Sequence, residues 1–264
     1  MGKLGPKKGI STAKRRLVIL QMLDEKNEVN ITDLSKMFSI SEVSIRNDLG
    51  TLENQNLLVR VRGGAMKNGL INREIKLKEK ISKNSKEKKA IAKAAAALIS
   101  NGDSILIDSG STTEELARLL TQREQLTIVT NALNIVQIFI DAPNISVVMP
   151  GGMLRHSSHS LVGMNQTQNL NNYYCDKLIL GADAINVNEG IFTPNLEEAN
   201  LNIEMIRISK EVILLADSSK FERKSLSKIA DIQAIHTIVT DSGLSVAQRQ
   251  VLQSKGVRLI IAEE

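Results

Sequence analysis

The segment SGSTT at residues 109–113 combines residue types that bind anions. It follows an aliphatic run at 104–108, which predicts a strand, and a helical pattern begins at Glu114. A loop that ends a strand and opens a helix presents backbone N–H groups, hydroxyls and the positive end of the helix dipole, which together favour phosphate. No Gly-Lys-Ser/Thr follows, so this is not a Walker loop. A well-capped helix start is the alternative interpretation of the segment taken alone.

Polar side chains also follow other predicted strands. Because the C-terminal ends of parallel strands line one edge of a sheet, these groups can converge on one pocket. Lys220 and Arg155 would hold a phosphate there, while carboxylate and amide oxygens would accept hydrogen bonds from sugar hydroxyls. An ordinary loop role is the alternative for each residue taken singly. The residues predicted to line the pocket are Asp108, Ser109, Gly110, Ser111, Thr112, Thr113, Asn131, Gly152, Arg155, Asp183 and Lys220.

The elements that must position these groups are short apolar runs separated by helical patterns. Near-continuous apolar strands that alternate with helices indicate an α/β domain, in which helices cover both faces of a mostly parallel sheet. Helical patterns at 113–120 and 200–208 lie between the strands. The predicted strands are 104–108, 126–130, 146–149, 178–180, 212–216, 237–239 and 258–261.

The beginning of the chain shows a different pattern. Apolar side chains give one buried side to a helix around 17–23 and to a second around 34–38, which we expect Thr32 to cap. A short turn follows, and Ser41 is a suitable N-cap for a third helix over 41–55. Two short helices, a tight turn and a third helix predict a helix-turn-helix. The plainer alternative is a basic three-helix segment of another kind.

The third helix has two distinct sides. Projected at about 100° per residue, its apolar residues Ile45, Leu49 and Leu52 cluster toward the core, and Asp48 at their margin is interpreted as structural. The N-terminal end of such a helix normally enters the major groove, where arginine pairs with guanine and asparagine with adenine. Phosphate or water contacts are the alternative for each exposed residue. The predicted DNA contacts of this helix are Ser41, Val43, Ser44, Arg46 and Asn47.

A wing follows this helix. The alternation over 58–62 predicts a strand, Gly63-Gly64 a tight turn, and Ala65-Met66 the start of the returning strand. Arg60 and Arg62 would then contact phosphate or the minor groove, which positions the protein without reading sequence.

Charge divides the chain in the same way as the patterns do. Residues 1–90 carry a net charge of +10 and residues 91–264 a net charge of −5. A basic head on an acidic body predicts an anionic partner at one end, and double-stranded DNA fits better than a membrane surface. The predicted division is a winged helix-turn-helix domain at 1–66, a basic and partly helical linker at 67–90, and an α/β ligand-binding domain at 91–264.

Other functional classes find little support. No apolar run approaches the roughly 18 residues of a membrane span, and the start lacks the apolar stretch of a signal peptide, so we expect a cytoplasmic protein without a membrane partner. The single cysteine, Cys175, excludes an internal disulfide. His156 and His159 have no evident third metal ligand, and we expect neither a metal nor another cofactor.

The string ISEVSIRNDLGTLENQNLLVRVRGGA resembles the signature of the DeoR family of bacterial transcriptional regulators. The resemblance continues through DSGSTT, TNALN, PGGMLR, LILGADAI and DSSKF, and covers nearly the whole chain from about residue 14. Ser44 stands where the family usually has Thr, Asn47 where a second Arg is common, and Arg62 where His is common. The difference at Asn47 leaves the preferred operator open.

The resemblance implies a homodimeric or homotetrameric repressor and a phosphorylated sugar as effector, bound by a domain similar to ribose-5-phosphate isomerase. TPNLEEANLNIEM looks most like regulators of amino-sugar utilisation. The similarity to the isomerase also raises an alternative function, an isomerase with a DNA-binding head. The available general bases for that reaction are Glu197, Glu198 and Glu204. The isomerase's glycine-rich segment and acidic motif are absent here, so we expect no enzyme. Glu198 and Asn195 would instead help to hold the effector or shape a lid over it. A DNA binder without sequence preference is a third possibility.

Overall fold

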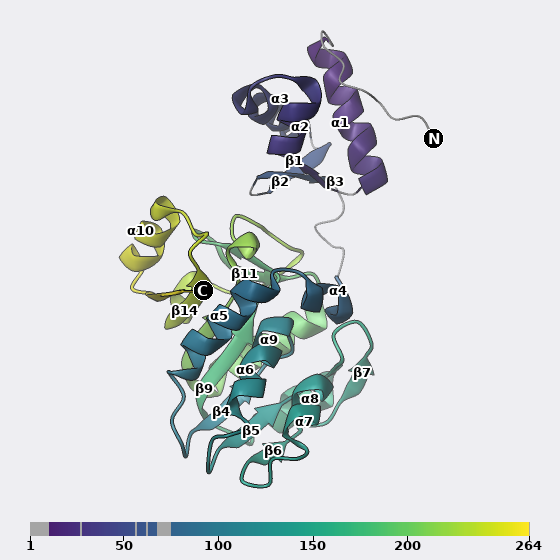
Figure 1. Ribbon diagram of the computed structural model, residues 1–264. Helices are drawn as coiled ribbons and strands as arrows, with labels where there is room; N and C mark the ends of the chain where they lie inside the picture. The colour runs from purple at the N-terminus through teal and green to yellow at the C-terminus, as the bar shows by residue number, and fades with distance from the viewer. Residues whose placement is uncertain (1–10, 27, 56, 62, 68–74, 264) are drawn as a thin grey trace. The chain divides into compact units, whose positions relative to one another are not determined.

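The computed structural model describes residues 11–26, 28–55, 57–61, 63–67 and 75–263, and the chain divides into two compact units, Met1–Arg73 and Glu74–Glu264 (Figure 1). Residues 74–90, which the sequence assigned to the linker, therefore belong to the second unit. Helix α5 explains this difference, because it buries the fully enclosed Ile91 and the nearly enclosed Lys88 against that unit.

The described residues of the first unit form three helices and a small antiparallel sheet with the strand order β1-β3-β2. Helices α2 and α3 are joined by a tight turn, as expected for a helix-turn-helix, and β2 and β3 form the wing. The elements are α1 (Thr12–Lys26), β1 (Glu28–Asn30), α2 (Ile31–Phe38), α3 (Glu42–Asn54), β2 (Leu58–Val61) and β3 (Gly64–Lys67).

The N-cap of α3 is the predicted residue, whereas the N-cap of α2 is not. Ser41 caps α3 as expected, since its hydroxyl accepts a hydrogen bond from the backbone N–H of Ser44 at 3.2 Å. The cap predicted at Thr32 is wrong. Asn30 caps α2 and accepts from the Thr32 N–H at 2.8 Å, because the unpredicted strand β1 runs directly into the helix. A Cβ at Gly64 would lie 2.0 Å from the carbonyl oxygen of Val29, so β1 and β3 pair only around a glycine.

Asp48 on α3 is structural, as predicted. The side chain is 2% exposed, and its two oxygens accept hydrogen bonds from Arg15 Nε at 2.6 Å and Arg16 Nε at 2.8 Å. Both arginines lie on α1, so this buried carboxylate joins α1 to the helix that carries the predicted DNA contacts. Ile45, Leu49 and Leu52 are buried beside it in the core of the unit, also as predicted.

The second unit is built on a seven-stranded parallel sheet with the order β15-β14-β12-β9-β4-β5-β6. All seven predicted strands are confirmed, with ends that move by up to three residues. The strands are β4 (Ser104–Ile107), β5 (Thr127–Thr130), β6 (Ser146–Val148), β9 (Cys175–Gly181), β12 (Ser209–Leu215), β14 (Thr237–Asp241) and β15 (Arg258–Ala262).

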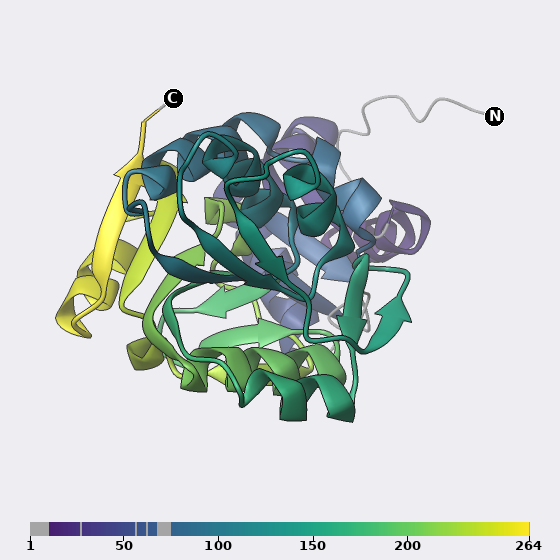
Figure 2. The ribbon, with the colours of Figure 1, turned by 90° about the horizontal axis from the view of Figure 1, so that it is seen from below.

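Helices cover both faces of this sheet (Figure 2). Ile105 and Ile107 of β4 pack on the side of α5, α6 and α7, whereas Leu106 packs on the side of α8, α9 and α10. This alternation buries the central strands on both faces, which explains their near-continuous apolar sequences. The helices are α4 (Leu77–Ser82), α5 (Ser85–Ala96), α6 (Ser111–Leu120), α7 (Leu133–Phe139), α8 (Met164–Leu170), α9 (Leu196–Arg207) and α10 (Val246–Ser254).

The second unit also contains short strands and two short 3-10 helices, η2 and η3. Two of the strands form an antiparallel hairpin, which the sequence did not predict, and three form a small antiparallel sheet with the order β10-β11-β13. No helix in the described ranges is long and apolar enough to cross a membrane. The short elements are β7 (Met153–Arg155), β8 (Ser160–Val162), β10 (Ala184–Asn186), β11 (Gly190–Thr193), η2 (Ser218–Lys220), β13 (Ser227–Ala230) and η3 (Ile232–Ala234).

Candidate functional site

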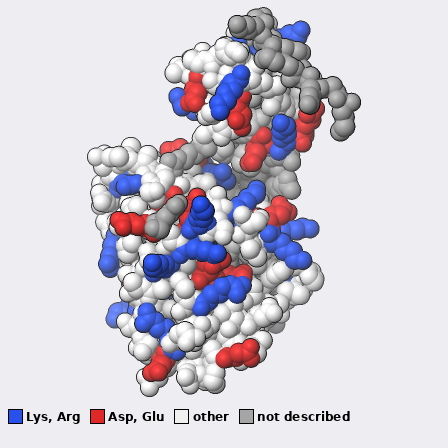
Figure 3. Space-filling view, viewed as in Figure 1, with Lys and Arg blue, Asp and Glu red and all other residues white. Residues whose placement is uncertain are grey.

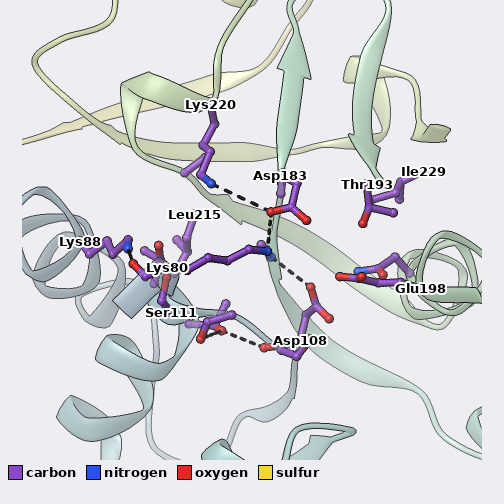
Figure 4. A pocket seen from close by; sticks show the side chains of 18 residues that line it. Lys80, Lys88, Asp108, Ser111, Asp183, Thr193, Glu198, Leu215, Lys220 and Ile229 are labelled. Atoms are coloured by element: carbon purple, nitrogen blue, oxygen red, sulfur yellow. Dashed lines mark hydrogen bonds and ion pairs between the residues drawn. The ribbon is translucent and has the colours of Figure 1, made fainter. Parts of the chain in front are cut away.

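A polar pocket lies where the central strands β4, β9 and β12 end, and α4, α5, α6, α9 and η2 contribute to its walls (Figure 4). Its hollow encloses about 510 Å³, part of which is open to solvent. The structure therefore brings most of the predicted pocket residues together. Those that line it are Asp108, Ser109, Gly110, Ser111, Thr112, Thr113, Asp183, Glu198 and Lys220.

The loop at 109–113 forms one wall of the pocket. Thr113 fixes its shape, because the hydroxyl donates to the carbonyl oxygens of Asp108 at 2.8 Å and Gly110 at 3.1 Å. Gly110 is the N-cap of α6 and offers no side chain to the first N–H groups of that helix. A Cβ at Gly110 would lie 3.1 Å from Thr113 Oγ1, within this packed turn. The loop thus presents hydroxyls and a helix N-terminus to the pocket, which suits an anion.

Three lysines supply positive charge to the same pocket. Lys80 Nζ lies 2.5 Å from Asp183 Oδ1, and Lys220 Nζ lies 4.0 Å from the same atom. Lys88 is 4% exposed and donates to the carbonyl oxygens of Lys80 and, at 2.6 Å, of Lys83. Burial lowers the pKa of Lys88 and of Lys220. A bound anion would offset the free-energy cost of burying these charged ammonium groups, because it would give them an oppositely charged partner.

Figure 3 shows basic and acidic side chains side by side on one face of this unit. Within the pocket, burial and the nearby Glu198 raise the pKa of Asp108 to about 7. Burial and the charge of Asp183 raise the pKa of Glu198. Asp183 behaves oppositely, because Lys80 and Lys220 outweigh its burial and lower its pKa. The surroundings therefore favour the ionised form of Asp183, whereas they favour the protonated forms of Asp108 and Glu198 more than water does.

Three buried oxygens in the pocket accept no hydrogen bond from any residue that the structure describes. They are Asp108 Oδ1, Thr193 Oγ1 and Asn202 Oδ1. Unsatisfied buried polar atoms are costly and rare, and a ligand that donates hydrogen bonds would satisfy them. The pocket thus has a part rich in hydroxyl and ammonium groups, which suits an anion, and a part that is rich in acceptors.

Three predicted residues do not line the pocket. Asn131 donates to the carbonyl oxygen of Leu161 at 3.2 Å and supports β8. Gly152 has φ of 124°, and a Cβ there would lie 2.9 Å from the carbonyl oxygen of Val162, so its role is in the hairpin. Arg155 lies behind the pocket wall, where it donates to Glu198 Oε2 at 2.7 Å. The reason is strand order: β5 and β6 lie outward from β4, away from the central strands.

The sequence missed four polar pocket residues, Lys80, Lys88, Thr193 and Asn202. Both lysines fall in the run that looked like a solvated linker. One signal was present for Lys88, since it shares a helical face with Ile91, Ala92 and Ala95, all of which are buried. A lysine on an apolar helix face indicates a buried ammonium with a specific partner.

Of the three glutamates considered as general bases, only Glu198 reaches the pocket, and it is paired with Arg155. Glu197 is exposed, and Glu204 pairs with Arg207 at 2.7 Å on the surface of α9. Asn195 caps α9 and accepts from the Glu198 N–H at 2.9 Å, so it orients Glu198 without lining the pocket.

The recognition helix α3 presents most of its predicted contacts outward. Ser41, Val43, Arg46 and Asn47 are exposed, and Ser44 is partly exposed. Arg46 donates to Glu42 Oε2 at 2.7 Å, and Glu42 Oε1 accepts from the Thr32 hydroxyl at 2.9 Å. Arg60 of the wing is exposed, and Arg62 lies outside the described residues.

A winged helix-turn-helix joined to an α/β domain with a charged pocket at its strand ends defines a ligand-responsive DNA-binding protein. Comparison of the chain with known protein families agrees with this class. Residues 15–69 match the DeoR-like helix-turn-helix domain, and residues 83–242 match the DeoR C terminal sensor domain. The chain belongs to the DeoR family of transcriptional regulators, and the predicted resemblance is confirmed.

Two relatives match almost end to end. The chain is 38% identical to the "Putative aga operon transcriptional repressor" of Escherichia coli O157:H7, over 98% of this chain and 97% of that protein. It is 34% identical to the "Uncharacterized HTH-type transcriptional regulator YulB" of Bacillus subtilis, over 94% and 95%. Among solved structures, ribose 5-phosphate isomerase A from Methanocaldococcus jannaschii aligns with a TM-score of 0.40 and 19% identity, over 52% of this chain and 55% of that one.

Proposed function

We propose that this protein is a cytoplasmic, homo-oligomeric repressor of sugar or amino-sugar utilisation genes, and that a phosphorylated sugar releases it from its operator. The observation that carries the proposal is the pocket's division into an anion-binding part and an acceptor-rich part. The 38% identical relative named as an aga operon repressor supports the operon class.

The anion-binding part fits a phosphate monoester. The loop at 109–113 offers hydroxyls and the N-terminus of α6, and Lys80, Lys88 and Lys220 border the same hollow. Charge-assisted hydrogen bonds to phosphate are about twice as strong as neutral ones. An unphosphorylated sugar would leave these lysines without an anionic ligand, so we expect it to bind much more weakly.

The acceptor-rich part fits the hydroxyls or the amine of a sugar. Asp108 Oδ1, Thr193 Oγ1 and Asn202 Oδ1 are buried acceptors without a donor among the described residues. A sugar ring offers several donors at a spacing of a few ångströms, whereas inorganic phosphate at neutral pH offers few. The whole ligand therefore contributes more than its phosphate.

The DNA-binding unit supports operator reading. Arg46 and Asn47 are exposed near the N-terminal half of α3, where such side chains meet base edges. Paired half-sites in operator DNA require paired reading helices, so we propose a homodimer or homotetramer. Arg60 would contact the backbone beside them.

The test is a thermal-shift screen of the full chain against sugar phosphates, including amino-sugar phosphates, with the matching free sugars and inorganic phosphate as controls. A ligand at about 100 times its Kd stabilises the unit that binds it by about 2.7 kcal/mol. We expect this only with phosphorylated sugars, and Lys220→Met should weaken it. Equal stabilisation by the free sugars would contradict the proposed phosphate site.

Operator release and catalysis are then measured with the same ligand. DNA selected in vitro by the full chain should bind with lower affinity once the sugar phosphate is present. The ligand should also be recovered unchanged after prolonged incubation, since an aldose–ketose conversion would favour the isomerase. A bound sugar phosphate that leaves DNA affinity unchanged would refute the regulatory proposal.

A further inference from the structure

We propose that Lys80 binds the phosphate of the effector and passes the binding event to helix α4, so that α4 couples the pocket to the DNA-binding unit. The inference rests on the proposed function, because it needs an anionic ligand in this pocket. It assigns a role to a residue in a segment that the sequence pattern assigned to a linker.

Helix α4 is short, and hydrogen bonds or ion pairs attach it to the unit at its start, its middle and its end. It spans Leu77–Ser82, with the Leu77 side chain buried. At its start, the Leu77 N–H donates to the carbonyl oxygen of Ser157 at 2.8 Å. In its middle, Lys80 Nζ reaches Asp183 Oδ1 at 2.5 Å. At its end, Lys88 Nζ donates to the carbonyl oxygens of Lys80 and Lys83.

Two of these attachments are made by ammonium groups that line the pocket. Figure 4 shows the Lys80 side chain extended across the hollow toward Asp183, with Lys88 to its left and Lys220 above. Lys80 also borders a smaller adjoining hollow, which it shares with Leu77 and Ser157. The side chain thus lies where the pocket, α4 and the turn of the β7–β8 hairpin meet.

An incoming phosphate would compete for both ammonium groups. Lys80 pairs with the Asp183 carboxylate, and that carboxylate also has Lys220 at 4.0 Å as a second cation. Lys88 donates to neutral carbonyls, and a hydrogen bond to phosphate is stronger than one to a neutral acceptor. Phosphate binding therefore changes the attachment of α4 in its middle and at its end while leaving its start in place.

The position of α4 in the chain gives this change a consequence. It begins at Leu77, three residues after Glu74, the first residue of the second unit. A rearrangement of α4 therefore alters the point at which the chain enters that unit. If Lys80 served only as the counter-ion of Asp183, ligand binding would still change the affinity for DNA after Lys80 is replaced.

The experiment compares Lys80→Met with Lys78→Met, a matched control in which an exposed lysine of the same helix is replaced. Lys80→Arg tests whether a cation at this position restores the response. Hydrogen exchange of peptides over 77–82 and affinity for in vitro selected DNA are measured in the full chain, without ligand and with inorganic phosphate or a stabilising sugar phosphate.

Without ligand, we expect Lys80→Met alone to raise exchange over 77–82. With ligand, the wild type, Lys78→Met and Lys80→Arg should change operator affinity by about 5-fold or more, a typical allosteric coupling, and Lys80→Met by less than about 2-fold although it still binds. A Lys80→Met protein that matches Lys78→Met in exchange and in response would overturn the inference. If no phosphorylated compound stabilises the wild type, the proposed function fails, and the ligand-free comparison still tests Lys80 separately.

Discussion

Replacing Asp108 by asparagine should stabilise the second unit at high pH. Asp108 is 2% exposed at the end of β4, and burial together with Glu198 raises its pKa to about 7 from a usual value of 3.8. Above pH 7 the folded protein must therefore keep a buried carboxylate ionised. Asparagine preserves the shape of the side chain and carries no charge, so it removes this penalty.

The magnitude follows from the two pKa values. At about 1.4 kcal/mol for each pKa unit, a rise from 3.8 to about 7 corresponds to about 4 kcal/mol. Because the folded pKa is the higher one, the folded state binds the extra proton between pH 4 and 7, and the stability of the wild type falls as pH rises through that range. Above pH 7 the Asp108 carboxyl is ionised in both the folded and the unfolded protein, so its effect on stability no longer changes with pH. The Asp108→Asn protein lacks this dependence, so its advantage should grow to at most about 4 kcal/mol at pH 8.

Urea denaturation between pH 5 and 8.5 measures this difference. The chain has two tyrosines, Tyr173 and Tyr174, and both lie in the second unit, so their fluorescence follows its unfolding. Asp183→Asn is the matched control, because Lys80 and Lys220 lower the pKa of that carboxyl and its loss should destabilise the unit at neutral pH. Parallel stability curves for Asp108→Asn and wild type across this pH range would refute the reasoning.

The sheet of the second unit was predictable because its strands are buried on both sides. β4 and the second half of β12 are near-continuous apolar runs, and such runs are recognisable without knowledge of their neighbours. β7 and β8 were missed, since three-residue strands are too short to show alternation and Met153 is 69% exposed. Their pairing depends on the rest of the fold.

The pocket was predictable only where strand order happened to favour it. Asp108 and Asp183 follow β4 and β9, which are neighbours at the centre of the sheet. Asn131 and Arg155 follow the outer strands β5 and β6, and their residue types alone looked equally suitable. A sequence shows that polar groups end strands, but the order of those strands decides which of them meet.

The lysines of the pocket show a different limit. Lys88 and its exposed neighbour Lys89 stand side by side in a basic run, yet the first is 4% exposed and binds the end of α4. Composition favours a solvated linker for such a run, because most lysines are exposed. The packing of α5 against the sheet turns Lys88 inward and leaves Lys89 exposed.

Two further predictions concern the DNA-binding unit. Asp48→Asn should lower the free energy of unfolding of that unit by about 3 kcal/mol, because it leaves Arg15 and Arg16 without their buried carboxylate. Hydrogen exchange of peptides from α1 and α3 in the full chain measures this, and unchanged exchange would contradict it. Glu42→Gln should weaken base discrimination, because Glu42 holds Arg46 at 2.7 Å and is itself held by α2 through a hydrogen bond. In vitro selection of DNA with the full chain tests this. We expect the preference for guanine to decrease at one position of the half-site and the other positions to stay unchanged, since removing a surface carboxylate does not weaken phosphate contacts. A selected motif identical to that of the wild type would show that Arg46 reads its base without help from Glu42.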